Sequence, residues 1–111
     1  MRTHRKVNAL EWLKSNQPYS FANGPENDQI IEFLEFLHEY GVTDSIVGVD
    51  EYEIYNSDEI EIRPTAELFI TFPKNMSTEN MISIMIEIGR LHPDEIDPER
   101  QDDLSIRLWW D

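Results

Sequence analysis

Acidic side chains dominate one stretch of the sequence, and carboxylates gathered in this way can bind cations, exchange protons or imitate the phosphates of a nucleic acid. Twelve of the 23 Asp and Glu residues lie within residues 15–62, where no Lys or Arg occurs. All nine bases lie outside this stretch, so the rest of the chain is nearly neutral and the formal net charge of −14 is a local feature. The twelve residues are Glu26, Asp28, Glu32, Glu35, Glu39, Asp44, Asp50, Glu51, Glu53, Asp58, Glu59 and Glu61. They predict a surface that favours positively charged partners.

Four of these residues have the spacing of one helix edge. Asp28, Glu32, Glu35 and Glu39 are four, three and four residues apart, and about 100° per residue places them within an arc of about 60°. Apolar residues fall on the opposite side, which predicts an amphipathic helix over 28–40. The three like-charge contacts destabilise such a helix by about 1 kcal/mol in total, and placing Lys among them would have given solubility without that repulsion. We therefore expect this edge to bind a partner.

A second acidic group lies in segments 47–55 and 58–62, which alternate in the manner of two strands and predict a β-hairpin. Because neighbouring side chains on a strand point to opposite faces, we expect the acids to share one face and the apolar residues the other. Same-face neighbours are about 6.6 Å apart, the same order as the phosphate repeat of a nucleic-acid strand. The residues expected on this face are Glu51, Glu53, Tyr55, Glu59 and Glu61.

Motifs for metal or cofactor chemistry are weak. Glu35-x-x-His38 matches one element of a di-iron bundle, but such a site needs two copies and two further carboxylates. The acidic segment 94–103 lacks the spacing of a calcium loop, and the absence of cysteine excludes thiolate ligands. No glycine-rich phosphate loop or nucleophile elbow occurs, and no carboxylate pair stands out as an acid–base couple. We expect no cofactor, no metal and no catalytic activity.

The pattern of apolar residues predicts a single α+β domain covering 1–111. The expected order is α-α-β-β-β-α-β, with a four-stranded, mostly antiparallel sheet and helices packed on one face. The expected helices are 3–16, capped by Thr3, then 28–40, and one from Ser77 or Thr78 to about Leu91; the expected strands are 47–55, 58–62, 66–72 and 104–110. Pro64 is expected in a turn and 92–103 in an acidic connection. The basic first helix could lie beside the acidic one and partly neutralise it.

Bulk properties point to a soluble cytoplasmic protein. No apolar run approaches the roughly 20 residues of a membrane span, and the basic N-terminus lacks the apolar core of a secretory signal. A pI near 4.4 opposes direct binding to nucleic acid or anionic lipid. Adaptation to high salt would spread acids over the whole surface, whereas here they are confined to one stretch.

These properties predict a protein that binds and occludes the basic, nucleic-acid-binding surface of another protein. The best match is an immunity protein that neutralises a bacterial nuclease toxin, with Trp109, expected to point outward, as an aromatic anchor. A phage-encoded DNA mimic acting against restriction or CRISPR nucleases is the first alternative. An adaptor domain would instead show a contiguous apolar patch at the sheet edge. A small hydrolase, the least favoured class, would show a pocket with two carboxylates in unlike environments.

Overall fold

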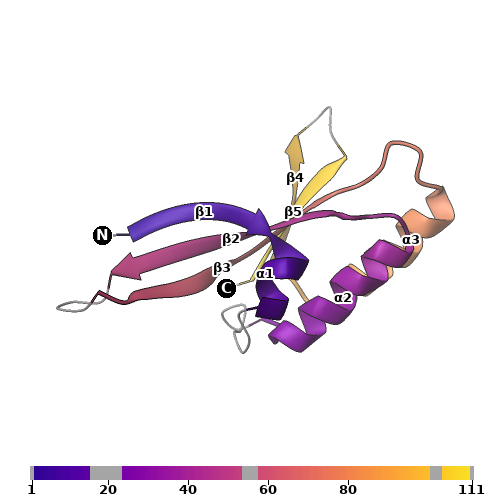
Figure 1. Cartoon of the computed structure of the whole chain (residues 1–111). Coiled ribbons are helices and arrows are strands. Elements are labelled where there is room, and N and C mark those ends of the chain that lie inside the picture. Colours follow the sequence, from indigo (N-terminus) through magenta and orange to yellow (C-terminus); the bar gives the residue numbers. More distant parts are fainter. Residues whose placement is uncertain (1, 16–23, 54–57, 101–103, 111) are drawn as a thin grey trace.

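Five strands form one antiparallel sheet that carries three helices on one face (Figure 1). The fold is taken from a computed structural model, which describes residues 2–15, 24–53, 58–100 and 104–110, with the backbone alone for 2–4, 51–53, 60–64 and 99–100. The elements are β1 (Arg2–Asn8), α1 (Ala9–Ser15), α2 (Asn27–Glu39), β2 (Asp44–Glu53), β3 (Ile60–Thr71), α3 (Thr78–Arg90), β4 (Glu95–Arg100) and β5 (Ser105–Trp109). The predicted α+β class is confirmed. The predicted strand number and element order are wrong, because β1 and β4 were missed.

The strand β1 replaces the first half of the helix predicted over residues 3–16. It pairs antiparallel with β2, and Val7 stands opposite Val47. All seven residues of β1 pair with β2, and this ladder of backbone hydrogen bonds outweighs a local preference that is weak in either direction. The helix begins only at Ala9, and its N-cap is Asn8 rather than Thr3: the Glu11 backbone N–H donates to Asn8 Oδ1 at 3.0 Å.

The strand β3 merges two segments that were predicted as separate strands. Pro64 lies inside β3 and pairs with Val49, so its predicted position in a turn is wrong. The register between β2 and β3 shifts between Val47 and Val49, and Ala66 takes a positive φ of 65° at this bulge. Proline is tolerated because β5 pairs only with residues 67–71, so that Pro64 has a ladder partner on one side alone.

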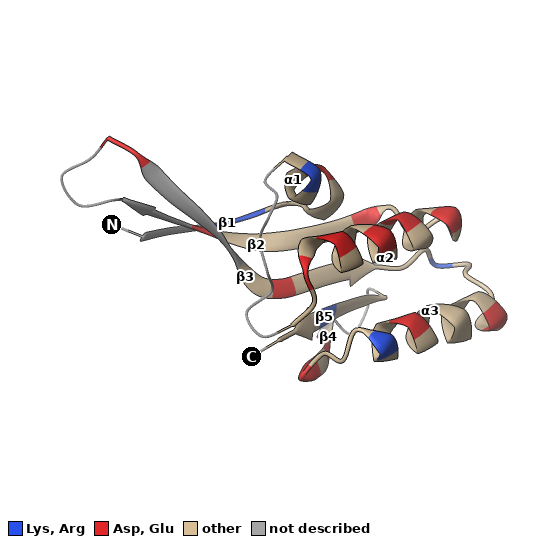
Figure 2. Cartoon of the chain, turned by 90° about the horizontal axis from the view of Figure 1, so that it is seen from below, with Lys and Arg blue, Asp and Glu red and all other residues tan. Residues whose placement is uncertain are grey.

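The helices α2 and α3 supply much of the core, as their periodicity predicts. Ile30, Leu34 and Leu37 on α2, with Ile84 and Ile88 on α3, are fully buried. They lie over the apolar face of the sheet, whose central residues are Val47, Val49, Leu68, Ile70 and Leu108, all at 0% exposure. The two helices run side by side across this face (Figure 2). Among the other apolar residues of α3, Met81 packs against the core, whereas Ile82, Met85 and Ile86 are exposed.

The strand β4 lies in the segment predicted as an acidic connection. The sheet order is β1-β2-β3-β5-β4, and every pairing is antiparallel, so the final crossover does not join parallel strands. β4 is an edge strand with Pro98 and a register shift within it, both of which suit a sheet edge. At the end of the predicted strand 104–110, Leu108 and Trp110 are buried, whereas Leu104 precedes β5 and is 48% exposed.

Candidate partner-binding surface

The acidic edge of α2 stands on a well-anchored helix. At its N-terminus the Glu26 backbone N–H donates to Gln29 Oε1 at 3.0 Å, which completes a capping contact. At its C-terminus Gly41 has a φ of 81°, and the Val42 backbone N–H donates to the Leu37 carbonyl at 2.9 Å. These bonds form a Schellman motif, for which a glycine in the left-handed region is the usual residue. The buried side of the helix and both caps therefore fix the direction of the opposite, acidic side.

All four predicted carboxylates of α2 are solvent-exposed. Asp28, Glu32, Glu35 and Glu39 lie on successive turns of the helix, and Figure 2 shows the acidic positions recurring along its length. Lys14 of α1 approaches Glu35, with 3.5 Å between Lys14 Nζ and Glu35 Oε1, and both side chains are 54% exposed. A pair this exposed contributes little to stability. The first helix thus neutralises one position of the edge, as expected, and the edge as a whole stays negative.

Because the carboxylates of this edge repel one another, we expect the double variant Glu32→Gln/Glu39→Gln to be more stable than the wild type. Each of the three like-charge contacts along the edge involves Glu32 or Glu39, and Glu39 also faces the negative end of the helix dipole. The free energy of unfolding should rise by about 1 kcal/mol, measured by urea denaturation. The matched control is Glu11→Gln/Asp44→Asn, which removes two exposed acids from other elements and should change stability by less than about 0.5 kcal/mol. A less stable edge variant would contradict the expected repulsion.

Most of the carboxylates predicted on one face of the β2–β3 hairpin are described by their backbone pairing alone. The register sets Glu51 opposite Ile62, Tyr52 opposite Glu61 and Glu53 opposite Ile60. The expectation of a common acidic face therefore stays a prediction.

The side chains of most predicted hairpin residues lie outside the described part of the structure. Tyr55 falls outside the described residues, and for Glu51, Glu53 and Glu61 the backbone alone is described. Glu59 is exposed just before β3 begins. Asp50, an acid of the same stretch, is buried at 8% exposure, between His4 of β1 and Arg63 of β3 in the register. The acidic strand β2 thus has basic residues on both neighbouring strands.

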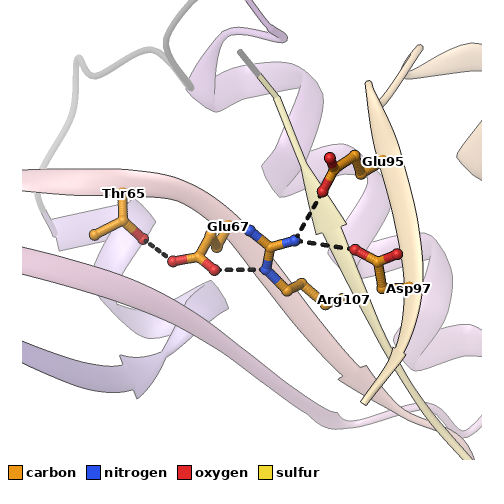
Figure 3. A network of polar contacts seen from close by, with 5 residues as sticks. All are labelled: Thr65, Glu67, Glu95, Asp97 and Arg107. Atoms are coloured by element: carbon orange, nitrogen blue, oxygen red, sulfur yellow. Dashed lines mark hydrogen bonds and ion pairs between the residues drawn. The ribbon is translucent and has the colours of Figure 1, made fainter.

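On the open face of the sheet, Arg107 holds three carboxylates. Arg107 Nε donates to Glu67 Oε2 at 2.6 Å, and one terminal nitrogen lies 3.1 Å from Asp97 Oδ2 and 3.4 Å from Glu95 Oε2 (Figure 3). Thr65 Oγ1 donates to the other Glu67 oxygen at 3.1 Å. The hydrogen bond to Glu67 raises the pKa of Arg107 above its ordinary value. Arg107 therefore stays charged at any physiological pH and ties the edge strand β4 to β5 and β3.

Trp109, the predicted aromatic anchor, lies half-buried beside this network. The Arg107 guanidinium carbon is 5.9 Å from the centre of its ring, and its cross-strand neighbours are Glu67 and Glu95. On the same open face Lys6 covers Phe69, with its ammonium 4.2 Å from the ring centre. Since Trp109 alternates with the buried Leu108 and Trp110, it lies on the sheet face opposite α2. The predicted set of site residues therefore does not form one surface.

Other features that could hold a ligand are modest. A hollow of about 220 Å³ lies between the start of α2 and the end of α3 and is lined by Gly24, Pro25, Gln29, Arg90, Leu91 and His92. It is smaller than the roughly 300–1,000 Å³ of typical small-molecule sites. Within the described residues, no three His, Asp or Glu side chains are placed to hold a metal ion. Among the described helices, none has the length and apolar character needed to cross a membrane.

The structure thus keeps one predicted site together, the four carboxylates of α2. It places Trp109 on the open face of the sheet, opposite α2. Sequence reasoning missed the Arg107 network. A signal was available: Glu95 and Asp97 alternate with the apolar Ile96, as in a strand, and the basic Arg107 lies on the last predicted strand. Comparison with known proteins found no matching family model, no matching curated protein and no matching solved structure.

Proposed function

We propose that this chain is an acidic, non-catalytic protein that binds a basic surface of another protein through the exposed edge of α2 and thereby occludes it. One observation carries the proposal: Asp28, Glu32, Glu35 and Glu39 are all exposed on a helix whose opposite side is locked into the core. The edge is about 16 Å long. Its carboxylates share one kind of environment, whereas acid–base catalysis needs carboxylates in unlike environments.

The basic surface is proposed to belong to a protein that handles nucleic acid. Lys and Arg side chains that normally contact phosphates would instead contact the carboxylates, which speeds the encounter and suppresses wrong partners. An immunity protein that neutralises a bacterial nuclease toxin fits the size and charge of this chain best, and a phage DNA mimic directed against restriction or CRISPR nucleases is the alternative. In either case the inhibitor competes with the nucleic acid for the same cationic groove.

The proposal is tested by comparing two variants that each remove three negative charges. The edge variant is Asp28→Asn/Glu32→Gln/Glu39→Gln, which leaves the Lys14–Glu35 pair intact. The control is Glu11→Gln/Asp44→Asn/Asp58→Asn, three exposed acids from separate parts of the chain. The edge variant should lose about 2 kcal/mol of binding free energy toward the basic partner, roughly thirty-fold in Kd. The control should change Kd by less than about three-fold.

The partner is obtained by affinity capture from a lysate of the source organism at low ionic strength, and its nuclease activity is then measured with and without this chain. Capture should decline as salt rises, because exposed charge pairs are screened. Inhibition of nuclease activity should follow the affinities of the variants. Capture that salt does not weaken, equal binding by the edge and control variants, or retrieval of no basic protein would overturn the proposal.

A further inference from the structure

The helix α3 carries apolar side chains on two sides, and the fold covers only one of them. Ile84 and Ile88 are fully buried against the sheet, whereas Ile82, Met85 and Ile86 are 55%, 42% and 54% exposed. With about 100° per residue, these three side chains and Gly89 fall within an arc of about 100° on the outer side of the helix. This outer stripe, Ile82, Met85, Ile86 and Gly89, has the i, i+3, i+4, i+7 spacing of a helix-packing face.

The electrostatic setting of the stripe favours a second copy of the chain as the partner. Residues 73–92 contain two acids, Glu79 and Glu87, and two bases, Lys74 and Arg90, so this segment is neutral in a chain of formal charge −14. Two such chains repel each other across their acidic stretches. The neutral outer side of α3 allows two copies to approach without that repulsion.

The charges at the two ends of the stripe are also self-complementary. Glu79 and Arg90 are exposed at opposite ends of α3 and lie on the same flank of the stripe, about 20° apart around the helix. In an antiparallel helix pair related by a two-fold axis, the same flanks face each other, so that Glu79 of one copy faces Arg90 of the other. Arg90 also bonds Glu87 at 2.6 Å, but its side chain is 71% exposed, and such a surface pair holds it weakly.

The shape of the stripe fits the same arrangement. Ile82 and Gly89 are equally far from a two-fold axis placed between Met85 and Ile86, so that each Ile82 meets the Gly89 of the other copy. A Cβ added at Gly89 would meet no atom within 4 Å, which leaves room there for an inserted side chain. We infer that the outer stripe of α3 is a homodimer interface in which two α3 helices pack antiparallel. This inference goes beyond the proposed function and does not depend on it.

A single helix pair buries less than the roughly 800 Å² per partner of a standard interface, so the dimer should dissociate on dilution, with a Kd on the order of tens of micromolar. Sedimentation velocity from about 5 to about 500 μM, at a salt concentration near 0.15 M where the Debye length is about 8 Å, measures this Kd. Ile82→Asp should abolish the dimer. Ile96→Asp, at an isoleucine of β4 that is 45% exposed, is the matched control and should leave it unchanged.

Two further changes separate a dimer interface from a loss of folding. Gly89→Leu improves helix propensity and meets no neighbour within its own chain, so the monomer should be at least as stable while the dimer weakens at least ten-fold. Glu79→Arg and Arg90→Glu should each weaken self-association. An equimolar mixture of these two single variants should restore the affinity, because both cross-copy pairs are then opposite in charge.

Restored affinity in the mixture, together with a well-folded monomeric Gly89→Leu variant, supports the inference. A wild-type chain that stays monomeric up to the highest concentration overturns it. So does a dimer that resists Ile82→Asp and Gly89→Leu, or a mixture that associates no better than either single variant.

Discussion

Trp110→Ala is expected to lower the free energy of unfolding by about 4 kcal/mol, within the range of large-to-small aromatic substitutions in cores. Trp110 is 1% exposed, and its Nε1 donates to the Leu91 carbonyl at the end of α3 at 2.9 Å. The side chain therefore joins the last strand to the last helix through both packing and a hydrogen bond. Against a typical total stability of about 5–15 kcal/mol, this loss leaves about 1–11 kcal/mol, so the variant should still fold but unfold at a much lower urea concentration.

The adjacent tryptophan provides the matched control for this substitution. Trp109 lies half-buried on the opposite face of the sheet, so Trp109→Ala should cost about 1 kcal/mol or less. Trp110→Phe keeps most of the buried ring but leaves the Leu91 carbonyl without its donor, and should cost about 1–2 kcal/mol. Urea denaturation followed by far-ultraviolet circular dichroism is the measurement, because fluorescence would change with the removal of a tryptophan. Equal effects at positions 109 and 110 would show that the alternation of β5 is misassigned.

Arg107→Met is expected to cost about 2.5 kcal/mol, because it leaves three neighbouring carboxylates without their shared cation. The side chains of Arg107 and Glu67 are 23% and 22% exposed, whereas those of Glu95 and Asp97 are 53% and 52% exposed. The bond to Glu67 should therefore provide most of the effect. Arg107→Lys keeps the charge but loses the planar fork of donors, and should cost about 1 kcal/mol.

Double-mutant cycles measure how the loss divides among the three acids. The coupling free energy between Arg107 and Glu67 should be about 1.5 kcal/mol, and that between Arg107 and Asp97 less than about 0.5 kcal/mol, since exposed pairs are screened by water. Replacing all three acids by their amides in the Arg107→Met background should recover much of the lost stability.

A group whose pKa is higher in the folded state than in the unfolded state stabilises the fold at every pH below its unfolded-state pKa. This stabilisation is lost only as the pH rises through the folded-state pKa. For Arg107 that loss lies far above physiological pH, so the cost of Arg107→Met should not vary between pH 7 and 9. A strong dependence in that interval would contradict the assignment.

Whether a segment could be predicted from its sequence depended on how local its stabilising contacts are. The helices α2 and α3 were predicted to within about two residues, because their hydrogen bonds, caps and apolar periodicity all lie within the segment itself. Of the two residues predicted to start α3, Ser77 is the cap, and Gly41 follows α2 with a positive φ. The candidate site on α2 follows from the same local periodicity, with the four carboxylates exposed as expected.

Most of the predictions that failed concern strands, whose partners lie far away in the sequence. β1 forms because residues 2–8 pair with β2 some forty residues later, and β4 forms because residues 95–100 pair with β5. The merging of residues 60–71 into one strand depends on pairing with β2 across a bulge, which no local propensity determines. The apolar character of Ile82 and Ile86 on α3 is likewise local, but which side of the helix meets the sheet is not, and both side chains are exposed.

The sequence by itself determined the class of the fold, the separation of acidic from basic segments and the acidic edge of one helix. These features depend only on the charge and spacing of residues that are close together in the chain. The tertiary structure decided that Glu67, Glu95 and Asp97 are neutralised by contact with Arg107 and that Asp50 is buried. It also decided which apolar residues stay exposed on α3. Both outcomes depend on pairing between strands and on the packing of helices against them, and these interactions join residues that are distant in the chain.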